Sequence, residues 1–294
     1  MLKKILFFLL FSSFWIVPKA YSQTDQIDSL LNEVLFQDDG FMDIYSSTKN
    51  FQFLYSRLNY DSKTYFAGRN IGIDQFNSTG QISYFHSIGI SIGAAAAYYS
   101  AMDPRISTVL LMAGYNGKFS KLKALRYRVS YARYFFPKSN LLASSSFNSS
   151  LNGGLTLSNK IIGSRVDYSF LMGKEYGSQV SWDLYGILNI LKFGKYNRIQ
   201  FEPEISLYFG SDQTIITQVS IVPGRLPRQY ITTELEKSKF GWMNTELKLP
   251  ITVSYRSLDF EIGYNLNFPR SIVTTDKFPT TSYFNFSVGY AISL

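Results

Sequence analysis

Residues 284–294 read FNFSVGYAISL. Large apolar residues occupy every second position of this stretch, and Asn, Ser, Gly and Ala lie between them. Successive side chains of a β-strand point to opposite faces, whereas a helix repeats about every 3.6 residues. The strict period of two therefore predicts a strand with one apolar face and one face of polar or small residues.

The same design recurs upstream. In 259–269 apolar residues alternate with Glu, Gly and Asn, and in 243–256 they alternate mainly with Glu, Lys, Thr and Ser. Extending the pattern along the chain predicts about twelve strands, with ten or fourteen as alternatives. The twelve segments are 51–60, 63–75, 80–100, 105–116, 122–135, 142–157, 161–173, 178–192, 196–210, 243–256, 259–269 and 281–294.

A wall between lipid and a wet interior has to alternate in this way. Aromatic residues make up 17% of the chain, with 22 Tyr and 25 Phe, and such a barrel needs them for its two interfacial girdles. A soluble β-sandwich also alternates, but the polar face here is mostly Ser, Gly and Asn rather than Lys and Glu. We therefore predict an all-β fold, a single transmembrane, antiparallel, up-and-down β-barrel over residues 49–294.

The predicted connections differ in length at the two ends of the barrel. An even number of strands places both chain ends on the periplasmic side. The connections expected there are short, namely 76–79, 117–121, 158–160, 193–197 and 257–258, whereas 211–242 and 270–280 lie at the other end. Short periplasmic turns and long external loops are typical of barrels in the bacterial outer membrane, which is the location we predict.

The N-terminal region divides into two predicted segments. Residues 1–22 form a secretory signal, with a basic start, an apolar run over 5–17 that is shorter than the roughly 20 residues of a spanning helix, and small residues before the cleavage point. Residues 23–48 form a helical periplasmic lead that could lie under the barrel, enter it as a plug, or hang as a tail. Its helix is predicted from apolar residues at helical spacing, Ile27, Leu30, Leu31, Val34 and Leu35.

Composition excludes several classes of protein. The chain has no Cys, which excludes disulfides and a lipid-modified cysteine. The net charge of +8 falls to +5 when Lys3, Lys4 and Lys19 leave with the signal. That charge is mild and scattered, so no nucleic-acid partner is expected. Beyond the signal, no apolar stretch is long enough for a membrane-spanning helix.

The C-terminal residues resemble the assembly signal of outer-membrane barrels, a polar-x-Gly-x-x-hydrophobic-x-hydrophobic pattern. Ser287, Gly289, Ile292 and Leu294 fill it, although the commonest form ends in aromatic residues. In organisation the chain also looks like uncharacterised outer-membrane barrels of Bacteroidota. The resemblance implies outer-membrane lipid as surroundings and the barrel-assembly machinery as a partner during biogenesis. It implies no catalytic residues.

Little in the sequence points to catalysis. Barrel phospholipases use a His and a Ser two residues apart on one strand, whereas the residues two away from His86 are Tyr84 and Ile88, and Ser87 points to the opposite face. One His and no Cys leave a transition metal without its usual ligands. We expect no enzyme, no cofactor and no metal. A lipid-modifying enzyme remains an alternative hypothesis.

Charged residues on the polar faces are the candidate functional residues. They must be paired or hydrated inside the barrel, because an isolated buried charge costs several kcal/mol. They could form a structural network that fills the barrel, or line a polar channel with a weak cation preference, since acids outnumber bases. The set is Arg126, Arg128, Arg165, Asp167, Asp183, Glu202, Glu204, Glu246, Lys248 and Glu261.

The predicted role is therefore passive. It is either a narrow porin-like pathway for small hydrophilic solutes or a structural membrane component. An alternative is adhesion or docking through 211–242, because a loop of this length in a compact fold is usually functional or disordered. The oligomeric state is not predicted.

Overall fold

The computed structural model describes residues 51–294, except 67, 71–73, 102–104, 123, 137–146, 175, 194–196, 222–229 and 273–276. For 66, 107, 211–221 and 230–239 it describes the path of the backbone only. The predicted signal peptide and helical lead lie outside the described residues. No helix in the described part of the chain is long and apolar enough to cross a bilayer.

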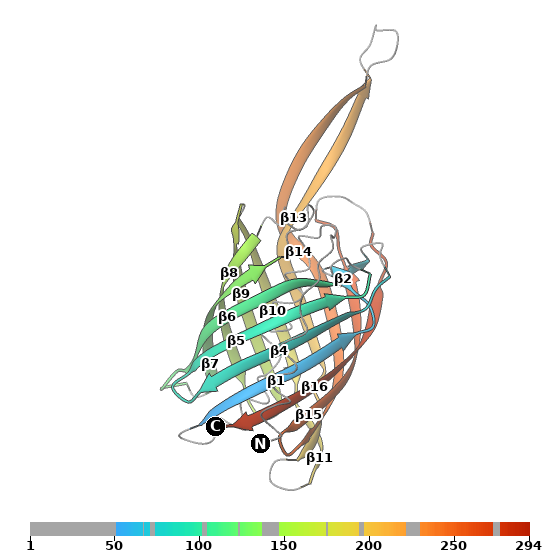
Figure 1. Ribbon diagram of the computed structural model, residues 1–294. Coiled ribbons are helices and arrows are strands. Elements are labelled where there is room, and N and C mark those ends of the chain that lie inside the picture. Colours follow the sequence, from blue (N-terminus) through green and yellow to red (C-terminus); the bar gives the residue numbers. More distant parts are fainter. Residues whose placement is uncertain are drawn as a thin grey trace.

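Twelve antiparallel strands form a closed barrel, which confirms the predicted architecture and count (Figure 1). Each strand pairs with its neighbours in chain order, and β1 closes the sheet by pairing with β16. The strands are β1 (Gln52–Asp61), β4 (Asn77–His86), β5 (Ile90–Tyr99), β6 (Ile106–Lys118), β7 (Leu125–Phe135), β8 (Phe147–Ser158), β9 (Ile162–Gly173), β10 (Tyr176–Gly186), β13 (Glu204–Ile221), β14 (Tyr230–Tyr255), β15 (Leu258–Pro269) and β16 (Thr281–Ser293).

Four short strands complete the described structure. β2 (Tyr65–Phe66) and β3 (Arg69–Asn70) form a small hairpin within the connection between β1 and β4. β11 (Leu188–Lys192) and β12 (Arg198–Phe201) continue β10 and β13 past breaks at Ile187 and at residues 202–203. β11 pairs with β12, and β12 pairs with the end of β14. The predicted strands 178–192 and 196–210 are therefore each interrupted once.

Two predicted strand boundaries are wrong, and the errors cancel in the count. Residues 63–75 are a connection, not a strand, and 80–100 contains both β4 and β5. The turn between these strands occupies 87–89, where Gly89 has a φ of 98°. Even-numbered residues point outward on both sides of this turn, so the alternation passes through it without a change of phase. The predicted periplasmic turn at 76–79 is accordingly replaced by 87–89.

The predicted loop 211–242 is also corrected. β13 and β14 stay paired as far as Ile221 opposite Tyr230, so most of this region is a two-stranded ribbon. The pairing of β10 with β13 ends at Gly210, and that of β15 with β14 ends at Asn244. Beyond these points the ribbon pairs with no other described strand, and Figure 1 shows it projecting from one end of the barrel.

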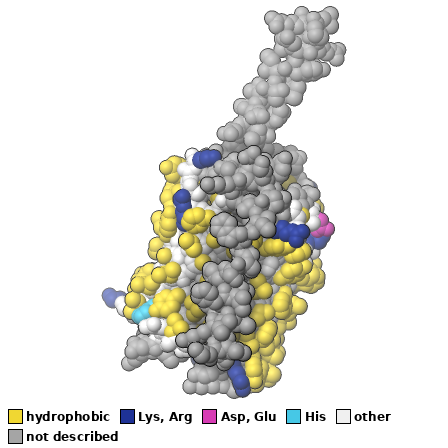
Figure 2. Space-filling view, viewed as in Figure 1, with side chains coloured by type: hydrophobic (Ala, Val, Ile, Leu, Met, Phe, Trp, Pro, Cys, Tyr) yellow, Lys and Arg dark blue, Asp and Glu magenta, His cyan; other side chains and the backbone are white. Residues whose placement is uncertain are grey.

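The two faces of the barrel wall differ in polarity. Exposed side chains such as Ile262, Phe286 and Tyr290 cover the outside, and Figure 2 shows a broad hydrophobic surface with charged side chains toward the ends. The inside is mainly polar, but among the described residues it also holds three apolar clusters, the smallest of which is Ala97 with Tyr99. Another lies on β5 to β9 and contains Ala95, Leu110, Ala132, Tyr134 and Leu171. The third lies near the start of β1 and contains Phe53, Tyr55 and Ala291.

The longest connections lie at one end of the barrel, although the two residues 174–175 join β9 to β10 there as well. Turns at 87–89, 159–161 and 256–257 lie at the end where β1 begins and β16 finishes, and Leu294 N–H there donates to the carbonyl of Gln52. The longer connections 62–76 and 270–280 lie at the opposite end, together with the ribbon. The short-turn end is periplasmic, as is usual for barrels with both chain ends on that side.

Candidate functional site

A row of inward-pointing polar residues crosses the middle of the wall from β9 to β15. Strand register places Arg165 opposite Asp183, Asp183 opposite Ser206, Ser206 opposite Glu246, and Glu246 opposite Asn267. Directly opposed residues share one face of a sheet, so the register brings these side chains together inside the barrel. We call this interior the lumen.

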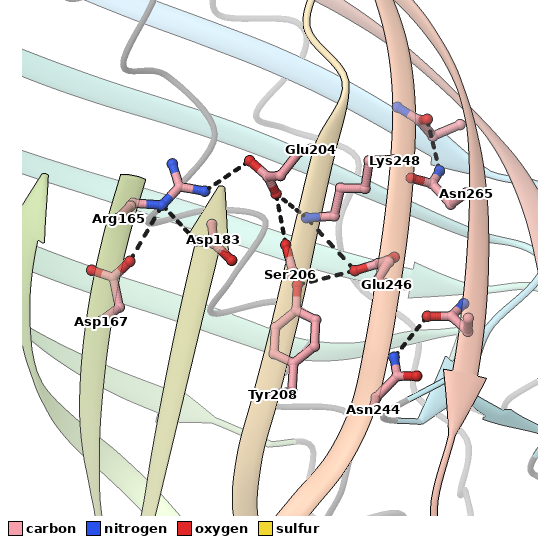
Figure 3. A network of polar contacts seen from close by, with 12 residues as sticks. Arg165, Asp167, Asp183, Glu204, Ser206, Tyr208, Asn244, Glu246, Lys248 and Asn265 are labelled. Carbon is pink, nitrogen blue, oxygen red and sulfur yellow. Dashed lines mark hydrogen bonds and ion pairs between the residues drawn. The ribbon is translucent and has the colours of Figure 1, made fainter. Parts of the chain in front are cut away.

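Three carboxylates surround Arg165. Its Nε lies 2.8 Å from Asp183 Oδ2 and 3.4 Å from Asp167 Oδ2, and its Nη2 lies 3.2 Å from Glu204 Oε2 (Figure 3). Arg128 extends the network, since its Nη2 lies 3.0 Å from Asp167 Oδ1. Arg165, Asp167 and Asp183 are buried, so these pairs are screened from solvent and depend on one another.

The network continues through Lys248 on β14. Its Nζ lies 3.1 Å from Glu204 Oε1 and 3.7 Å from Glu246 Oε2. Tyr208 and Tyr283 each donate a hydrogen bond of 3.0 Å to Glu246, one to each carboxylate oxygen. Glu204 therefore links the Arg165 group to the Lys248 group, and the ion-paired residues reach from β7 to β14.

A separate ion pair, between Arg57 and Glu261, lies beside this network. Arg57 Nη2 is 3.4 Å from Glu261 Oε2 and donates to Ser287 Oγ at 2.8 Å. Side-chain amides continue the row toward the extracellular end. Asn285 donates to Glu261, Asn265 donates to Asn285, and Asn244 donates to Asn267.

The structure brings together seven of the ten charged residues singled out from the sequence: Arg128, Arg165, Asp167, Asp183, Glu204, Glu246 and Lys248. Glu261 pairs with Arg57 instead. Arg126 on β7 and Glu202, at the break between β12 and β13, do not join the network through ion pairs between described residues. Strand pairing places Arg126 opposite Thr156 of β8, and Glu202 N–H donates to the carbonyl of Pro250.

Sequence reasoning missed Arg57, Asp61, Tyr208 and Tyr283. Arg57 and Asp61 lie on the same face of β1 as Phe53 and Tyr55, which are apolar yet point inward. Apolar residues on both faces of β1 hide its orientation. Tyr208 and Tyr283 belong to strands whose orientation was predicted. Each lies an even number of residues from a predicted inward residue of its own strand, and this spacing was the signal that could have identified it.

The first extracellular connection, 62–76, folds over one side of the lumen. Thr281 Oγ1 donates to the carbonyl of Gly68 at 2.6 Å, and Tyr65 Oη donates to the carbonyl of Ser282. Gly68 has a φ of 75°, and a Cβ atom there would lie 2.7 Å from side-chain atoms of Asn244 and of Asn267. The hairpin of β2 and β3 therefore rests directly on the lumen-facing amides of β14 and β15.

His86 ends β4 near the periplasmic side, on the outer face. Its ring accepts a hydrogen bond from Ile88 N–H, contacts Gln52 Nε2 at 3.3 Å, and lies edge-on to Tyr84. Among the described residues, no group of three or more His, Cys, Asp or Glu side chains is arranged to hold a metal ion.

The four residues of the predicted assembly signal separate onto two faces of β16. Ser287 and Gly289 face the lumen, whereas Ile292 and the adjoining Leu294 are exposed on the outer face. This separation follows from the alternation of the strand. The outward pair lies at the periplasmic end of the hydrophobic surface.

No protein-family model matches the chain, and no curated protein matches its sequence. Among solved structures, the KdgM porin shares 8% identity at a TM-score of 0.46, with 81% of this chain and 98% of that chain covered. The NanC porin shares 11% identity at 0.46, with the same coverage. OmpF of Salmonella typhi shares 8% identity at 0.29, covering 84% and 99%. Similarity at this level assigns neither a family nor a substrate.

The architecture of the chain itself identifies its environment. Only helices and closed barrels satisfy all backbone groups within lipid, and here a closed barrel has an apolar outer face and a mainly polar lumen. The protein is an outer-membrane β-barrel of a bacterial cell. Its outer face contacts lipid, and its porin-like lumen is the candidate functional site.

Proposed function

We propose that the barrel is a narrow, passive pathway for small hydrophilic solutes. The observation that carries this proposal is the direction of the lumenal ion pairs. Those between described residues of the network and its neighbours join groups on one strand, on adjacent strands or on strands two apart, as with Arg128 and Asp167 or Arg57 and Glu261. Within the described part of the chain, the network follows the wall and lines the lumen without bridging it.

Unpartnered polar groups support a wet lumen. Asn59 Oδ1, Asn152 Oδ1, Asn244 Oδ1 and Ser130 Oγ are inward-facing and lack a hydrogen-bond partner in the described part of the chain. In a dry interior each would cost about 1–3 kcal/mol, whereas water or a polar solute satisfies them at little cost. These groups therefore favour a hydrated interior over a packed one.

The charges favour a weak preference for cations. The sequence placed four basic and six acidic residues on the polar faces, and the structure adds Arg57, Lys118, Arg198, Asp61 and Asp259 at inward positions. Three of these are basic and two acidic, so the acidic excess falls from two to one. Because most charges are paired, only this excess acts on a passing ion.

Conductance tests the pathway directly. The purified protein in planar bilayers is expected to give discrete current steps in KCl, with a zero-current potential of the sign for cation preference. Ser130→Phe adds a ring inside the lumen without removing a hydrogen bond between described groups, and should reduce the step size. The matched control is Gly153→Phe on the outer face, where an added Cβ meets nothing within 4 Å.

Equal currents in both variants would contradict a path through the lumen. A correctly folded wild-type barrel without current would leave the second proposed role, that of a structural membrane component. The proposed role involves no chemistry in either case. The organisational resemblance to barrels of Bacteroidota fits both roles and stays a hypothesis about origin.

A second candidate function, docking to an external partner, is favoured by the ribbon. Its strands are paired only to each other between Ser211 and Phe240, and isolated two-stranded ribbons have marginal stability in water. No other described strand pairs with either backbone edge of the ribbon, and edges of this kind can pair with another chain.

Protease treatment of intact cells tests whether the ribbon is accessible. Trypsin is expected to cleave within 211–242, where the sequence contains Arg225 and Arg228, and to spare Lys192 at the periplasmic end of β11. After the cells are opened, Lys192 should become a cleavage site as well. Protection of 211–242 in intact cells would contradict external docking through this segment.

A further inference from the structure

Asp61 is a buried carboxylate without a cation beside it. It ends β1 on the inner face, and its residue is 7% exposed. Its side-chain hydrogen bonds come from the amides of Asn59 and Asn77. Among the described residues, no Lys, Arg or His lies within ion-pair distance of it. Arg57, the cation on the same face, is engaged by Glu261 and Ser287.

Other acceptors without partners lie around this carboxylate. Asn59 is 3% exposed and donates its Nδ2 to Asp61, while its Oδ1 has no hydrogen-bond partner among the described residues. Glu246 on β14 lies two strands beyond β16, pairs with Lys248, and accepts a hydrogen bond from Tyr283 of β16. Gln75, which follows the β2–β3 hairpin, is 3% exposed, and neither of its polar side-chain atoms has a hydrogen-bond partner among the described residues.

The chemistry of this group is one-sided. Asp61 has no ion-paired cation among the described residues, and Asn59, which is 3% exposed, contributes a carbonyl oxygen with no partner among them, whereas Glu246 is already paired with Lys248. A buried anion without a counter-charge is costly, and a cation with several N–H donors would satisfy the charge and the free oxygen together. Three carboxylates do not converge here, so the group suits one positive charge better than a divalent metal.

We propose that Asp61 and Asn59 bind the ammonium group of a small organic cation at the extracellular third of the lumen. The inference rests on the proposed pathway and names the class of solute that it favours. The hairpin of β2 and β3 covers this side of the mouth, so a solute reaching Asp61 passes beside Thr64, which accepts a hydrogen bond from Asn77.

The experiment uses the mature protein and two probes of nearly equal shape, 1,4-diaminobutane and the neutral 1,4-butanediol. The diamine is expected to reduce the K⁺ current through planar bilayers in a concentration-dependent way, and the diol is expected to have no effect. Asp61→Asn keeps the shape of the side chain and should weaken the block about tenfold or more, as expected for loss of a charge-assisted hydrogen bond.

The matched control is Asp74→Asn. Asp74 belongs to the same extracellular connection, but its side chain is 84% exposed and pairs with Lys63 at 3.5 Å. Removal of this charge from the mouth should leave the block nearly unchanged. Block by the diol, an unchanged block in Asp61→Asn, or loss of the block in Asp74→Asn would each overturn the assignment.

A second readout does not depend on current. Ligand binding to the folded state raises the unfolding temperature, so the diamine should stabilise the detergent-solubilised wild type but not Asp61→Asn. Folding of the variant is checked by its heat-modifiable migration in gels. A barrel that is stabilised by the diamine but never conducts would overturn the pathway alone. A conducting barrel that shows neither block nor stabilisation would overturn this inference alone.

Discussion

Arg165→Ala is expected to lower the free energy of unfolding of the detergent-solubilised barrel by about 3–5 kcal/mol. Arg165 is the cation shared by Asp167, Asp183 and Glu204 on three different strands. Its removal leaves these carboxylates facing one another, with Arg128 and Lys248 as their remaining ion-paired cations among the described residues. Breaking a buried ion pair from one side costs more than the pair contributes, because the remaining charge keeps its desolvation penalty.

Urea titration of the folded fraction measures this effect. Arg133→Ala is the matched control, since Arg133 is exposed on the outer face and bonds only Asn148 among the described contacts. A change within about 0.5 kcal/mol is expected there. Arg165→Lys should fall between the two, because it keeps the charge but loses the planar fork of donors. A loss below 1 kcal/mol in Arg165→Ala would show that the network contributes little to stability.

Gly289→Val is expected to impair closure of the barrel. Gly289 lies on β16 opposite Arg57 of β1, at the seam between the last and first strands. A Cβ atom there would lie 2.8 Å from Cζ of Tyr55, so this ring, which is 2% exposed and packed in the cluster with Phe53 and Ala291, would have to shift. Overpacking of this kind costs about 1–3 kcal/mol. The folded fraction after refolding from urea into detergent should fall accordingly.

Refolding in detergent also tests packing at Gly289 separately from recognition by the barrel-assembly machinery, because that machinery is absent. The control is Gly153→Val, where the added Cβ meets nothing. Tyr55→Ala should rescue the fold of Gly289→Val in detergent if the ring is the obstacle. Failure of that rescue would point to another cause. Normal refolding combined with poor insertion in cells would assign Gly289 to the assembly signal alone.

Strand prediction succeeded where one face of the wall is uniformly apolar. In β15 and β16 the outward residues are large and the inward ones are Glu, Asn, Ser and Gly, so period and orientation follow from the sequence. β1 and β6 carry apolar side chains on both faces, as Phe53 and Leu110 show, and alternation cannot orient them. The turn at 87–89 was missed because even-numbered residues point outward both before and after it, so the alternation shows no break there.

The candidate site could be predicted as a set of residues but not as a set of partners. The alternation of inward and outward side chains identified the inward charges of β9, β13 and β14. The partners of Arg165, however, depend on which residues stand opposite one another. That information lies in strand register, which hydrogen bonding between distant segments fixes. Asp61 was missed because it lies one residue beyond the predicted end of its strand.

The ion pairs along the wall have a geometric consequence. Alternation of side chains rejects a one-residue slip between strands but tolerates a slip of two, which returns every residue to its own face. A two-residue slip moves a side chain by about 7 Å, which would separate Arg165 from Asp183 and Lys248 from Glu204. In a closed cylinder, strand number and stagger together set tilt and radius. The row of ion pairs from β9 to β14 therefore helps to fix the strand register, and with it the radius of the barrel.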